Sequence, residues 1–302
     1  MSWLNEGRTV IITGGASGIG LAITRRIAQD NNKVVIVGRR QQALDAAVAE
    51  LSAKGLKVEG FRGDVTTPSE RVALFSELTT KYPQASVLIN NAGVMKRVDL
   101  LGEEPWESVV TELDINLHAP IHLSTLFAKY WTEKNVSGVI ASTTSGLSFV
   151  PLAISPIYCA TKAALHSFIW SLRHQLKTKN IKVIEIIPPA VNTDLMGPGG
   201  MTHGVNLDEF ADDIYAKLKN GDEEVAYQFA ETGRVGYRNA SLEVKIWSSL
   251  PSITDQSVPI SATTSKASAV SIIKEPVIIR EEVTHTYDKT SFRRISNPTF
   301  SD

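Results

Sequence analysis

Two residues of this chain have the types and the spacing that proton transfer needs. Tyr158 and Lys162 lie four positions apart, which places both side chains on one face of a helix. A lysine ammonium beside a phenol favours the phenolate, so we expect Lys162 to lower the pKa of Tyr158 from its ordinary value of about 10. A tyrosine tuned in this way donates or accepts a proton near neutral pH. Ser145, thirteen positions before Tyr158, adds a hydroxyl that can hold a substrate oxygen.

A glycine-rich segment near the N-terminus has the context of a phosphate-binding loop. The segment Thr13–Gly20 follows the apolar run Thr9–Ile12 and opens the amphipathic stretch Leu21–Ala28. A strand, a glycine turn and a helix in this order let backbone N–H groups approach a pyrophosphate at the positive end of the helix dipole. The residues predicted to line this site are Gly14, Ser17, Gly18, Ile19 and Gly20.

In these two motifs and in four shorter ones, the chain resembles the short-chain dehydrogenases/reductases of the main, single-domain type. Asp64-Val65 stands where the family contacts adenine, and Asn90-Asn91-Ala92-Gly93 where it has a structural and cofactor-site motif. Asn116 stands where the family has its relay asparagine. The segment Pro188–Thr193 resembles the Pro-Gly-x-Val-x-Thr turn beside the nicotinamide carboxamide, with proline in place of the usual glycine.

Three longer stretches are similar to the DltE-like branch of these oxidoreductases. They are Ser145–Pro151, Tyr158–Phe168 and Ile186–Leu195. The resemblance as a whole extends over roughly residues 5 to 250. It implies a hydride transfer between a nicotinamide cofactor and a small carbonyl or alcohol substrate, in a homodimer or homotetramer.

The resemblance also implies a role for each site residue. Tyr158 would be the general acid/base, Ser145 would orient the substrate oxygen, and Asn116 would anchor a water molecule of a proton relay. Lys162 would lower the tyrosine pKa and hold the nicotinamide ribose. The expected cofactor-binding residues are Gly14, Ser17, Gly18, Ile19, Gly20, Arg39, Asp64, Val65, Asn91, Ala92, Gly93, Tyr158, Lys162, Pro188, Val191 and Thr193.

The end of the second predicted strand indicates which nicotinamide cofactor is bound. A site that prefers NAD offers an acidic residue there to the ribose 2′-hydroxyl. This chain instead has Gly38, followed by Arg39 and Arg40. Because the repelling carboxylate is missing and Arg39 can form charge-assisted hydrogen bonds to a 2′-phosphate, the sequence predicts NADP. The alternative is that both arginines simply belong to a surface loop.

Composition excludes several classes of partner. The chain has 302 residues, 43% of them hydrophobic, and a net charge of −1, so nothing points to nucleic acid or to an anionic membrane. Its single cysteine, Cys159, cannot form an intrachain disulfide. The first residues lack the apolar core of a signal peptide, and we find no apolar run long enough to span a bilayer. We therefore expect a cytoplasmic protein.

Short apolar runs alternate with longer helical patterns along the first 250 residues. Such alternation predicts an α/β fold of the Rossmann type, a doubly wound parallel sheet with helices on both faces. The predicted strands are Val10–Thr13, Lys33–Val37, Lys57–Arg62, Val87–Asn90, Gly138–Thr143, Ile181–Ile187 and Val225–Phe229. The predicted helices cover residues 18–29, 41–54, 69–81, 104–133, 156–179 and 207–219.

The last part of the chain differs in composition from the rest. Residues 251–302 are rich in serine and threonine with little periodicity, so we predict a single domain, 1–250, and a mostly disordered C-terminal extension, 251–302. The motif around Ser296, with Arg293 and Arg294 before it and Pro298 after it, matches a kinase site. Phosphorylation there would create a peptide for a phosphopeptide-binding partner, unless the short motif arose by chance.

Several residues allow a second interpretation. Ser142 competes with Ser145 as the oxygen-binding serine. His118 and His122 are four apart, but Pro120 lies between them and we find no third ligand, so packing or a surface role is preferred to a metal site. Cys159 is interpreted as a packing residue, because neighbouring side chains of a helix point apart.

Three other functions remain open at this stage. The first is a non-catalytic NADP-binding scaffold or redox sensor with a partner-docking tail. The second is a sugar-nucleotide epimerase, although Gly14, Gly18 and Gly20 have a different spacing from the loop of those enzymes. The third is a regulated complex in which the tail recruits a partner.

Overall fold

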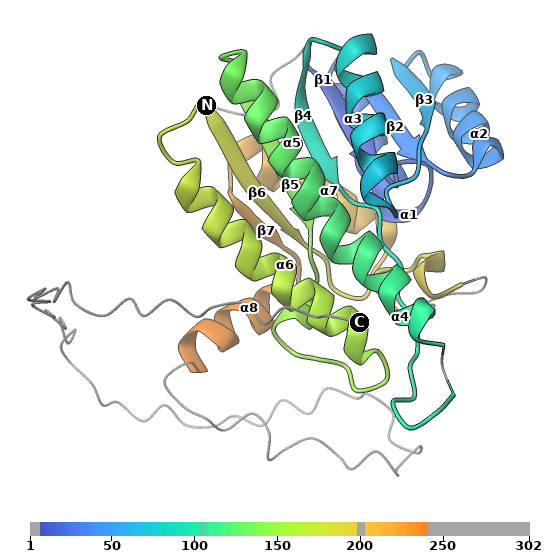
Figure 1. Ribbon diagram of the computed structural model, residues 1–302, viewed down its shortest axis with the longest axis vertical. Coiled ribbons are helices and arrows are strands. Elements are labelled where there is room, and N and C mark those ends of the chain that lie inside the picture. The colour runs from blue at the N-terminus through green and yellow to red at the C-terminus, as the bar shows by residue number, and fades with distance from the viewer. Residues whose placement is uncertain (1–6, 104, 198–202, 241–302) are drawn as a thin grey trace, which may run out of the picture. The chain divides into compact units, whose positions relative to one another are not determined.

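A computed structural model describes residues 7–103, 105–197 and 203–240 and shows a seven-stranded parallel sheet between helices (Figure 1). The strand order is β3-β2-β1-β4-β5-β6-β7, which confirms the predicted Rossmann-type α/β fold. The strands are β1 (Thr9–Thr13), β2 (Lys33–Gly38), β3 (Val58–Arg62), β4 (Ala85–Asn90), β5 (Gly138–Thr143), β6 (Ile181–Ile187) and β7 (Glu224–Ala226). The helices are α1 (Gly18–Gln29), α2 (Gln41–Ser52), α3 (Pro68–Lys81), α4 (Trp106–Leu113), α5 (Ala119–Glu133), α6 (Pro156–Gln175), α7 (Leu207–Asn220) and α8 (Phe229–Ala240).

The central strands are buried along their whole length and mostly apolar, because both faces of the sheet are covered. Every residue of β1 and of β5 is buried, which is typical of a parallel sheet between two helical layers. β1 lies between β2 and β4, with Val10 opposite Val34 on one side and Val87 on the other. The sheet order reverses at β1, where the chain crosses from β3 to β4 on its other side.

Two hydrophobic layers hold the helices against the sheet. Side chains of α1, α2 and α7, such as Ile23, Leu44 and Phe210, pack on one face. Side chains of α3, α5 and α6, such as Leu74 and Phe127, pack on the other, which is the face toward the viewer in Figure 1. The sheet is thus fixed on both sides, and the loops at its carboxyl edge are held by rigid elements.

Local signals in the sequence define several helix ends. Helix α3 begins with a capping box, in which the Thr67 hydroxyl accepts from the N–H of Glu70 and the Glu70 carboxylate accepts from the N–H of Thr67. Helix α7 begins after Asn206, whose side chain accepts from two backbone N–H groups, and ends at Gly221 in the left-handed conformation with φ 92°. These caps explain why the predicted boundaries lie within a few residues of the observed ones.

The predicted helix 104–133 contains a feature that the sequence did not reveal. Helices α4 and α5 are joined by a π-helical turn, Asp114–His118, which contains Asn116. Turns of this kind are rare and occur frequently at functional sites. Hydrophobic periodicity does not detect one extra residue within a long helix.

The C-terminal end of the domain differs from the prediction. The predicted strand Val225–Phe229 is shorter, because β7 ends at Ala226 and Phe229 begins the unpredicted helix α8. Gly233 and Gly236 lower the helix propensity of this segment, and tertiary contacts override that preference. In α8, the guanidiniums of Arg234 and Arg238 both pair with Glu224 of β7, at 3.0 and 2.6 Å.

The chain divides into two units, Met1–Ile253 and Thr254–Asp302. All the described residues belong to the first unit. The predicted tail 251–302, with its motif around Ser296, lies outside them, and the predicted domain boundary stays a prediction.

A substitution at Gly138, the first residue of β5, would test how tightly the hydrophobic layer around Trp131 is packed. A methyl group added at Gly138 would lie 2.4 Å from Cε3 of Trp131, a fully buried ring whose Nε1–H donates to the Ala85 carbonyl at 2.9 Å. We expect Gly138→Ala to lower the free energy of unfolding by about 1–3 kcal/mol, the usual effect of overpacking. Urea denaturation followed by circular dichroism measures the change.

Gly236→Ala is the matched control for this substitution. Gly236 lies in α8, and a methyl group there meets nothing within 4 Å. Alanine has the higher helix propensity, so this variant should gain about 0.5–1 kcal/mol. A Gly138→Ala protein as stable as the unchanged chain would contradict the tight contact with Trp131.

Candidate active site

The motifs singled out in the sequence meet at one edge of the sheet. They follow the carboxyl ends of β1, β4, β5 and β6, at Thr13, Asn90, Thr143 and Ile187. In a doubly wound parallel sheet, ligands bind beyond this edge, where the strand order reverses. The fold therefore brings residues that are distant in the sequence into one region.

Tyr158 and Lys162 lie in α6, are both buried and face the end of β5. The side chains are 6% and 3% exposed, and the Lys162 ammonium lies 5.5 Å from the centre of the Tyr158 ring. Lys162 Nζ donates to the Thr143 carbonyl at 2.8 Å. Ser145, just after β5, is near enough to the Tyr158 hydroxyl to act on its pKa. The three residues thus form one cluster of polar groups at the end of β5.

Burial controls the protonation of this pair in a way that differs from the expectation. Burial raises the pKa of Tyr158 above its ordinary value, while the Ser145 hydroxyl acts in the opposite direction. The same burial lowers the pKa of Lys162 to about 8. The expected lowering of the tyrosine pKa by Lys162 is therefore wrong for this structure, because removing both groups from water disfavours both of their charged forms.

Asn91 connects the glycine loop to this cluster. Its side-chain N–H donates to the carbonyls of Thr13 and Gly14 at 3.3 and 3.2 Å. Its side-chain oxygen accepts from the Thr143 hydroxyl at 3.4 Å, and the Thr143 carbonyl accepts from Lys162. The loop after β1 and the residues after β5 therefore keep a fixed relation to each other.

The glycine loop has the shape of a cradle for a dinucleotide phosphate. Gly14 and Gly18 have φ of 66° and 52°, in the left-handed region that favours glycine. A methyl group at Gly20 would lie 2.2 Å from the Gly14 carbonyl oxygen, so only glycine fits there. At the start of α1 the Ser17 side chain makes no cap, and the first turn carries no acidic residue. Backbone N–H groups and the helix dipole thus suit an anion, and the residues present fit the cofactor that the fold implies.

The residues predicted to hold the adenosine half lie together beyond β2 and β3. Arg39 Nη1 lies 3.8 Å from Asp64 Oδ2, and Asp64 Oδ1 accepts from the backbone N–H and the hydroxyl of Thr66 at 2.9 and 2.6 Å. The buried Arg71 donates to the carbonyls of Val65 and Thr66, both at 2.8 Å. The Asp64 carboxylate and the Arg39 guanidinium are thus side by side beyond the ends of β2 and β3.

Asn116 uses its side chain to hold the loop after β4. Its Oδ1 accepts from the N–H of Val94 at 2.9 Å, and its Nδ2 donates to the Val94 carbonyl at 2.8 Å. Gly93 lies against the same group, since a methyl there would be 3.3 Å from Asn116 Oδ1 and 3.8 Å from Lys162 Nζ. The amide therefore braces Ala92, Gly93 and Val94 near the catalytic pair.

The segment after β6 approaches the glycine loop from the other side. The Pro188 carbonyl accepts from the N–H of Gly146 at 2.8 Å, and buried Val191 forms a bridge with Val205. The methyl carbon of Thr193 lies 3.4 Å from the position of a methyl at Gly18. The predicted nicotinamide turn and the glycine loop thus lie close together.

The structure separates the alternatives that the sequence left open. Ser142 lies in β5 and accepts from Asn90 Nδ2 at 3.4 Å, whereas Ser145 reaches Tyr158. Cys159 Sγ is buried and accepts from the N–H of Leu152 at 3.2 Å, as expected of a packing residue.

His118 and His122 make separate contacts. His118 Nδ1 lies 2.8 Å from Asp114 Oδ1, and His122 Nδ1 accepts from Arg71 Nε at 3.2 Å. Within the part of the chain that the structure describes, we find no group of three histidine, cysteine or acidic residues placed to hold a metal ion. In the same residues we find no helix long and apolar enough to cross a membrane.

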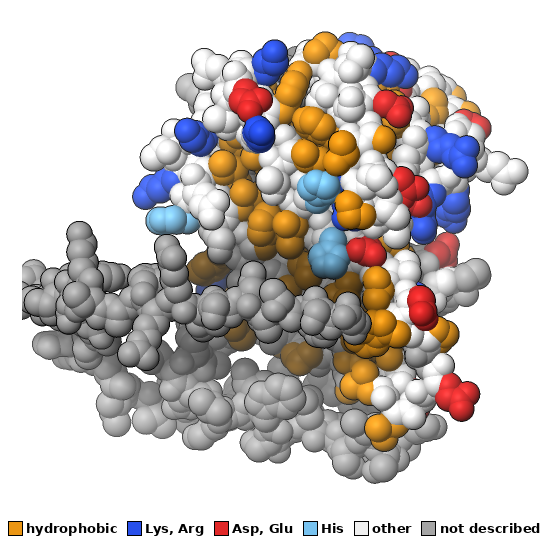
Figure 2. Space-filling view, viewed as in Figure 1, with side chains coloured by type: hydrophobic (Ala, Val, Ile, Leu, Met, Phe, Trp, Pro, Cys, Tyr) orange, Lys and Arg blue, Asp and Glu red, His pale blue; other side chains and the backbone are white. Residues whose placement is uncertain are grey.

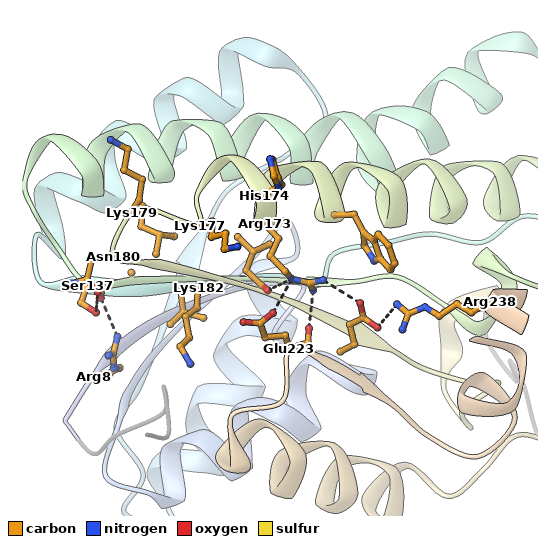
Figure 3. Close-up of a pocket in the computed structure, with 16 residues that line it drawn as sticks. Arg8, Ser137, Arg173, His174, Lys177, Lys179, Asn180, Lys182, Glu223 and Arg238 are labelled. Carbon is orange, nitrogen blue, oxygen red and sulfur yellow. Dashed lines mark hydrogen bonds and ion pairs between the residues drawn. The ribbon is translucent and has the colours of Figure 1, made fainter. Parts of the chain in front are cut away.

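An open groove of about 940 Å³ lies at the opposite edge of the sheet (Figure 3). It is lined by the starts of β5 and β6 and by the end of α6, with Lys177, Lys179 and Lys182 among its residues. The Arg173 side chain is held in place in this groove. It donates to the Val183 and Glu223 carbonyls, both at 3.0 Å, and pairs with Glu224 at 3.2 Å. None of the motif residues lines this groove, so it is separate from the catalytic cluster.

Three residues of the site were not predicted. Thr143 acts through its own backbone carbonyl, and Arg71 acts by donating to backbone carbonyls. A sequence has no signal for contacts of this kind. Glu112 is fully buried in α4 beside the catalytic helix. Its position four residues before Asn116, inside a helical pattern, is a signal that could have found it.

Comparison with known proteins agrees with this geometry. The family model described as short chain dehydrogenase matches residues 8–201. The chain is 39% identical over 239 residues to the uncharacterized oxidoreductase DltE of Bacillus subtilis, a match that covers 77% of this chain and 91% of that protein.

Solved structures have the same fold. A short-chain dehydrogenase from Sphingobium yanoikuyae in complex with NADPH is 25% identical with a TM-score of 0.69, covering 81% of this chain and 99% of that one. A short-chain dehydrogenase/reductase from Burkholderia phymatum in complex with NAD is 21% identical with a TM-score of 0.70, covering 80% and 96%. Because the family model and the match to DltE each cover more than half of the chain, it belongs to the short-chain dehydrogenase/reductase family, in the branch that includes DltE.

Proposed function

We propose that this protein is an NADP(H)-dependent oxidoreductase that interconverts a small carbonyl compound and the corresponding alcohol. The observation that carries the proposal is the buried Tyr158–Lys162 pair, connected through Thr143 and Asn91 to the glycine loop. A bound nicotinamide supplies the hydride, and the protein supplies position and the proton. In this proposal the glycine loop holds the cofactor, and the Tyr158–Lys162 pair supplies the proton.

In this proposal Tyr158 is the proton donor to the carbonyl oxygen, and Ser145 orients that oxygen. The raised pKa of Tyr158 keeps the phenol protonated at neutral pH, which a donor needs for reduction. The Lys162 ammonium holds the nicotinamide ribose and stabilises the phenolate that remains after transfer. Asn116 positions the loop that carries Gly93 beside this pair, and the water of the proton relay would lie next to it.

The preference for NADP rests on the end of β2. Gly38 itself carries no carboxylate, and the side chain of Arg39, 55% exposed and 3.8 Å from Asp64, is accessible to a phosphate. The similar Sphingobium enzyme is in complex with NADPH, which supports the same assignment for this chain. Gly14, Ser17, Gly18, Ile19 and Gly20 would hold the pyrophosphate.

Asp64 and Val65 would contact the adenine, and the segments after β4 and β6 would contact the nicotinamide half. The residues of these two segments are Asn91, Ala92, Gly93, Pro188, Val191 and Thr193.

The alternative function, an NADP-binding scaffold or redox sensor, predicts binding without turnover. A panel of ketones and aldehydes, assayed with NADPH and with NADH, separates the two. Cofactor binding with no oxidation across the panel would favour the scaffold.

Tyr158→Phe keeps the ring and removes the proton donor. We expect turnover to fall by at least about a hundredfold, the usual effect of losing acid catalysis, while the Kd for NADPH changes little. The control is Tyr130→Phe, which makes the same change in a half-buried ring of α5 that packs edge-to-face with Phe75. Activity of Tyr158→Phe within a few-fold of the unchanged enzyme would rule out the proposed acid.

Arg39→Ala tests the choice of cofactor. The variant should bind NADPH about 10- to 100-fold more weakly and NADH almost as well as before, because only NADPH carries the 2′-phosphate. Dissociation constants come from fluorescence titration. Arg40→Ala, at the neighbouring exposed position, is the control, and an equal loss for both cofactors in Arg39→Ala would show that Arg39 does not read the phosphate.

The family likeness and the surface support a homodimer or homotetramer. Figure 2 shows hydrophobic side chains gathered over α5 and α6. Trp106 of α4 and Trp170 of α6 are 69% and 46% exposed, unusually high for tryptophan. Light scattering of the full chain should give a mass of two or four times 32.9 kDa. A mass of one chain at micromolar concentration would contradict the assignment.

A further inference from the structure

A second buried acid–base pair lies behind the loop that carries Ser145, and the proposed mechanism does not use it. Glu185 lies in β6 and is fully buried, and His166 lies in α6 with 15% of its side chain exposed. His166 Nδ1 is 2.9 Å from both carboxyl oxygens of Glu185. Since a carboxylate only accepts hydrogen bonds, Nδ1 donates in this contact, which holds the imidazole in one orientation.

The pair is connected to the residue that precedes Ser145. The Thr144 hydroxyl donates to Glu185 Oε1 at 2.7 Å, and the Thr144 N–H donates to the Ile186 carbonyl at 2.8 Å. Thr144 is 1% exposed, so both contacts lie in the core. Strand β6 therefore holds Thr144 through its side chain as well as through its backbone.

The imidazole also contacts the chain on the other side of Ser145. The His166 ring packs edge-to-face with Phe149, with 4.8 Å between the ring centres, and Phe149 is itself buried. Phe149 lies four residues after Ser145. His166 thus acts on both sides of Ser145, on Thr144 through Glu185 and on Phe149 directly.

The helix that carries His166 also carries the proposed proton donor. His166 follows Lys162 by one helical turn and Tyr158 by two, so the three side chains lie along one face of α6. Lys162 holds the carbonyl of Thr143, and His166 holds the next residue, Thr144, through the carboxyl group between them. Two successive residues before Ser145 are therefore bound by two successive turns of α6.

Stability alone does not account for a buried pair of this kind. Removing a carboxylate and an imidazole from water is costly, and apolar side chains of similar volume often replace such pairs without loss of stability. A hydrogen bond differs from apolar packing because it has a direction, so a satisfied polar network fixes one arrangement of the core. What Glu185 and His166 add is therefore the position of the loop that they hold.

We infer that Glu185 and His166 are positioning residues that fix Ser145 relative to Tyr158. The inference rests on the proposed function for its consequence in catalysis, in which Ser145 orients the substrate oxygen. A displacement of about 1 Å in an active site can lower turnover about a hundredfold. Loss of the pair should therefore appear in kcat and not in the binding of the cofactor.

The double variant Glu185→Met/His166→Leu replaces the pair with apolar side chains of similar volume. We expect kcat for NADPH-dependent reduction to fall about 10- to 100-fold, while the Kd for NADPH changes less than about threefold. The midpoint of urea unfolding should stay at or above that of the unchanged chain, because neither partner is left buried alone. Thr144 keeps an acceptor, since the Ile186 carbonyl lies 3.3 Å from its hydroxyl.

Asparagine and leucine have nearly the same shape, so a matched pair of variants at position 166 isolates the hydrogen bond. His166→Asn puts an N–H donor near the place of Nδ1 and should keep kcat within a few-fold, whereas His166→Leu should not. Glu185→Gln, which still accepts from Thr144, gives the same comparison with Glu185→Met. An equal fall of kcat in His166→Asn and His166→Leu would overturn the inference.

His174→Leu is the control on the same helix. It makes the same change at an exposed position of α6, about two turns beyond His166, and should leave every measurement unchanged. If His166→Leu alone does not fold, the double variant takes its place in the comparison with His166→Asn.

A measurement that needs no substrate separates this inference from the proposed function. The N–H groups of Thr144 and Gly146 flank Ser145 and donate to the Ile186 and Pro188 carbonyls, both at 2.8 Å. Their hydrogen exchange, followed by NMR, should be at least about tenfold faster in the double variant. If the unchanged protein reduces no carbonyl compound, the proposed function fails, while hydrogen exchange still tests the hold on the loop. Unchanged exchange in the folded double variant, or faster exchange with an unchanged kcat, would overturn the inference.

Discussion

The side-chain amide of Asn91 fixes the relation on which the rest of the site depends. One end of the amide binds the carbonyls at the start of the glycine loop, and the other end binds Thr143 at the end of β5. Since the Thr143 carbonyl also holds Lys162, a single side chain connects the cradle for a phosphate to the proton-transferring pair. Hydride transfer needs a cofactor and an acid in one fixed geometry, and a buried network on rigid strands provides it.

Burial then decides the chemistry of the pair. Taking a phenol and an ammonium out of water disfavours the charged form of each, so Tyr158 stays a phenol and Lys162 loses its proton more easily than a surface lysine. Burial acts in the same way on Glu112 of the facing helix, whose pKa it raises. Each of the three buried groups is thus shifted toward its neutral form.

The sequence predicted the sheet, the glycine loop and the segments that meet at its carboxyl edge, because each has a local signal. Continuous apolar runs mark the buried strands, and a glycine turn before a helix marks the phosphate loop. Three features depend on tertiary contacts and had no such signal. Helix α8 forms despite two glycines, since Glu224 pairs with its arginines. The pKa of Tyr158 rises because of burial, and Glu112 is buried where α4 packs on α6.

The π-helical turn between α4 and α5 affects the direction of the Asn116 side chain more than the packing of the two helices. Such a turn contains one residue more than the α-helical turn it replaces. A chain that lost Ile115 could therefore join α4 to α5 by regular helix, with both helices keeping their buried faces against the core. The Asn116 amide would then point at a different angle about the helix axis and would lose its two hydrogen bonds to Val94. A single deletion here would thus change the position of the loop that carries Gly93 even where both helices remain.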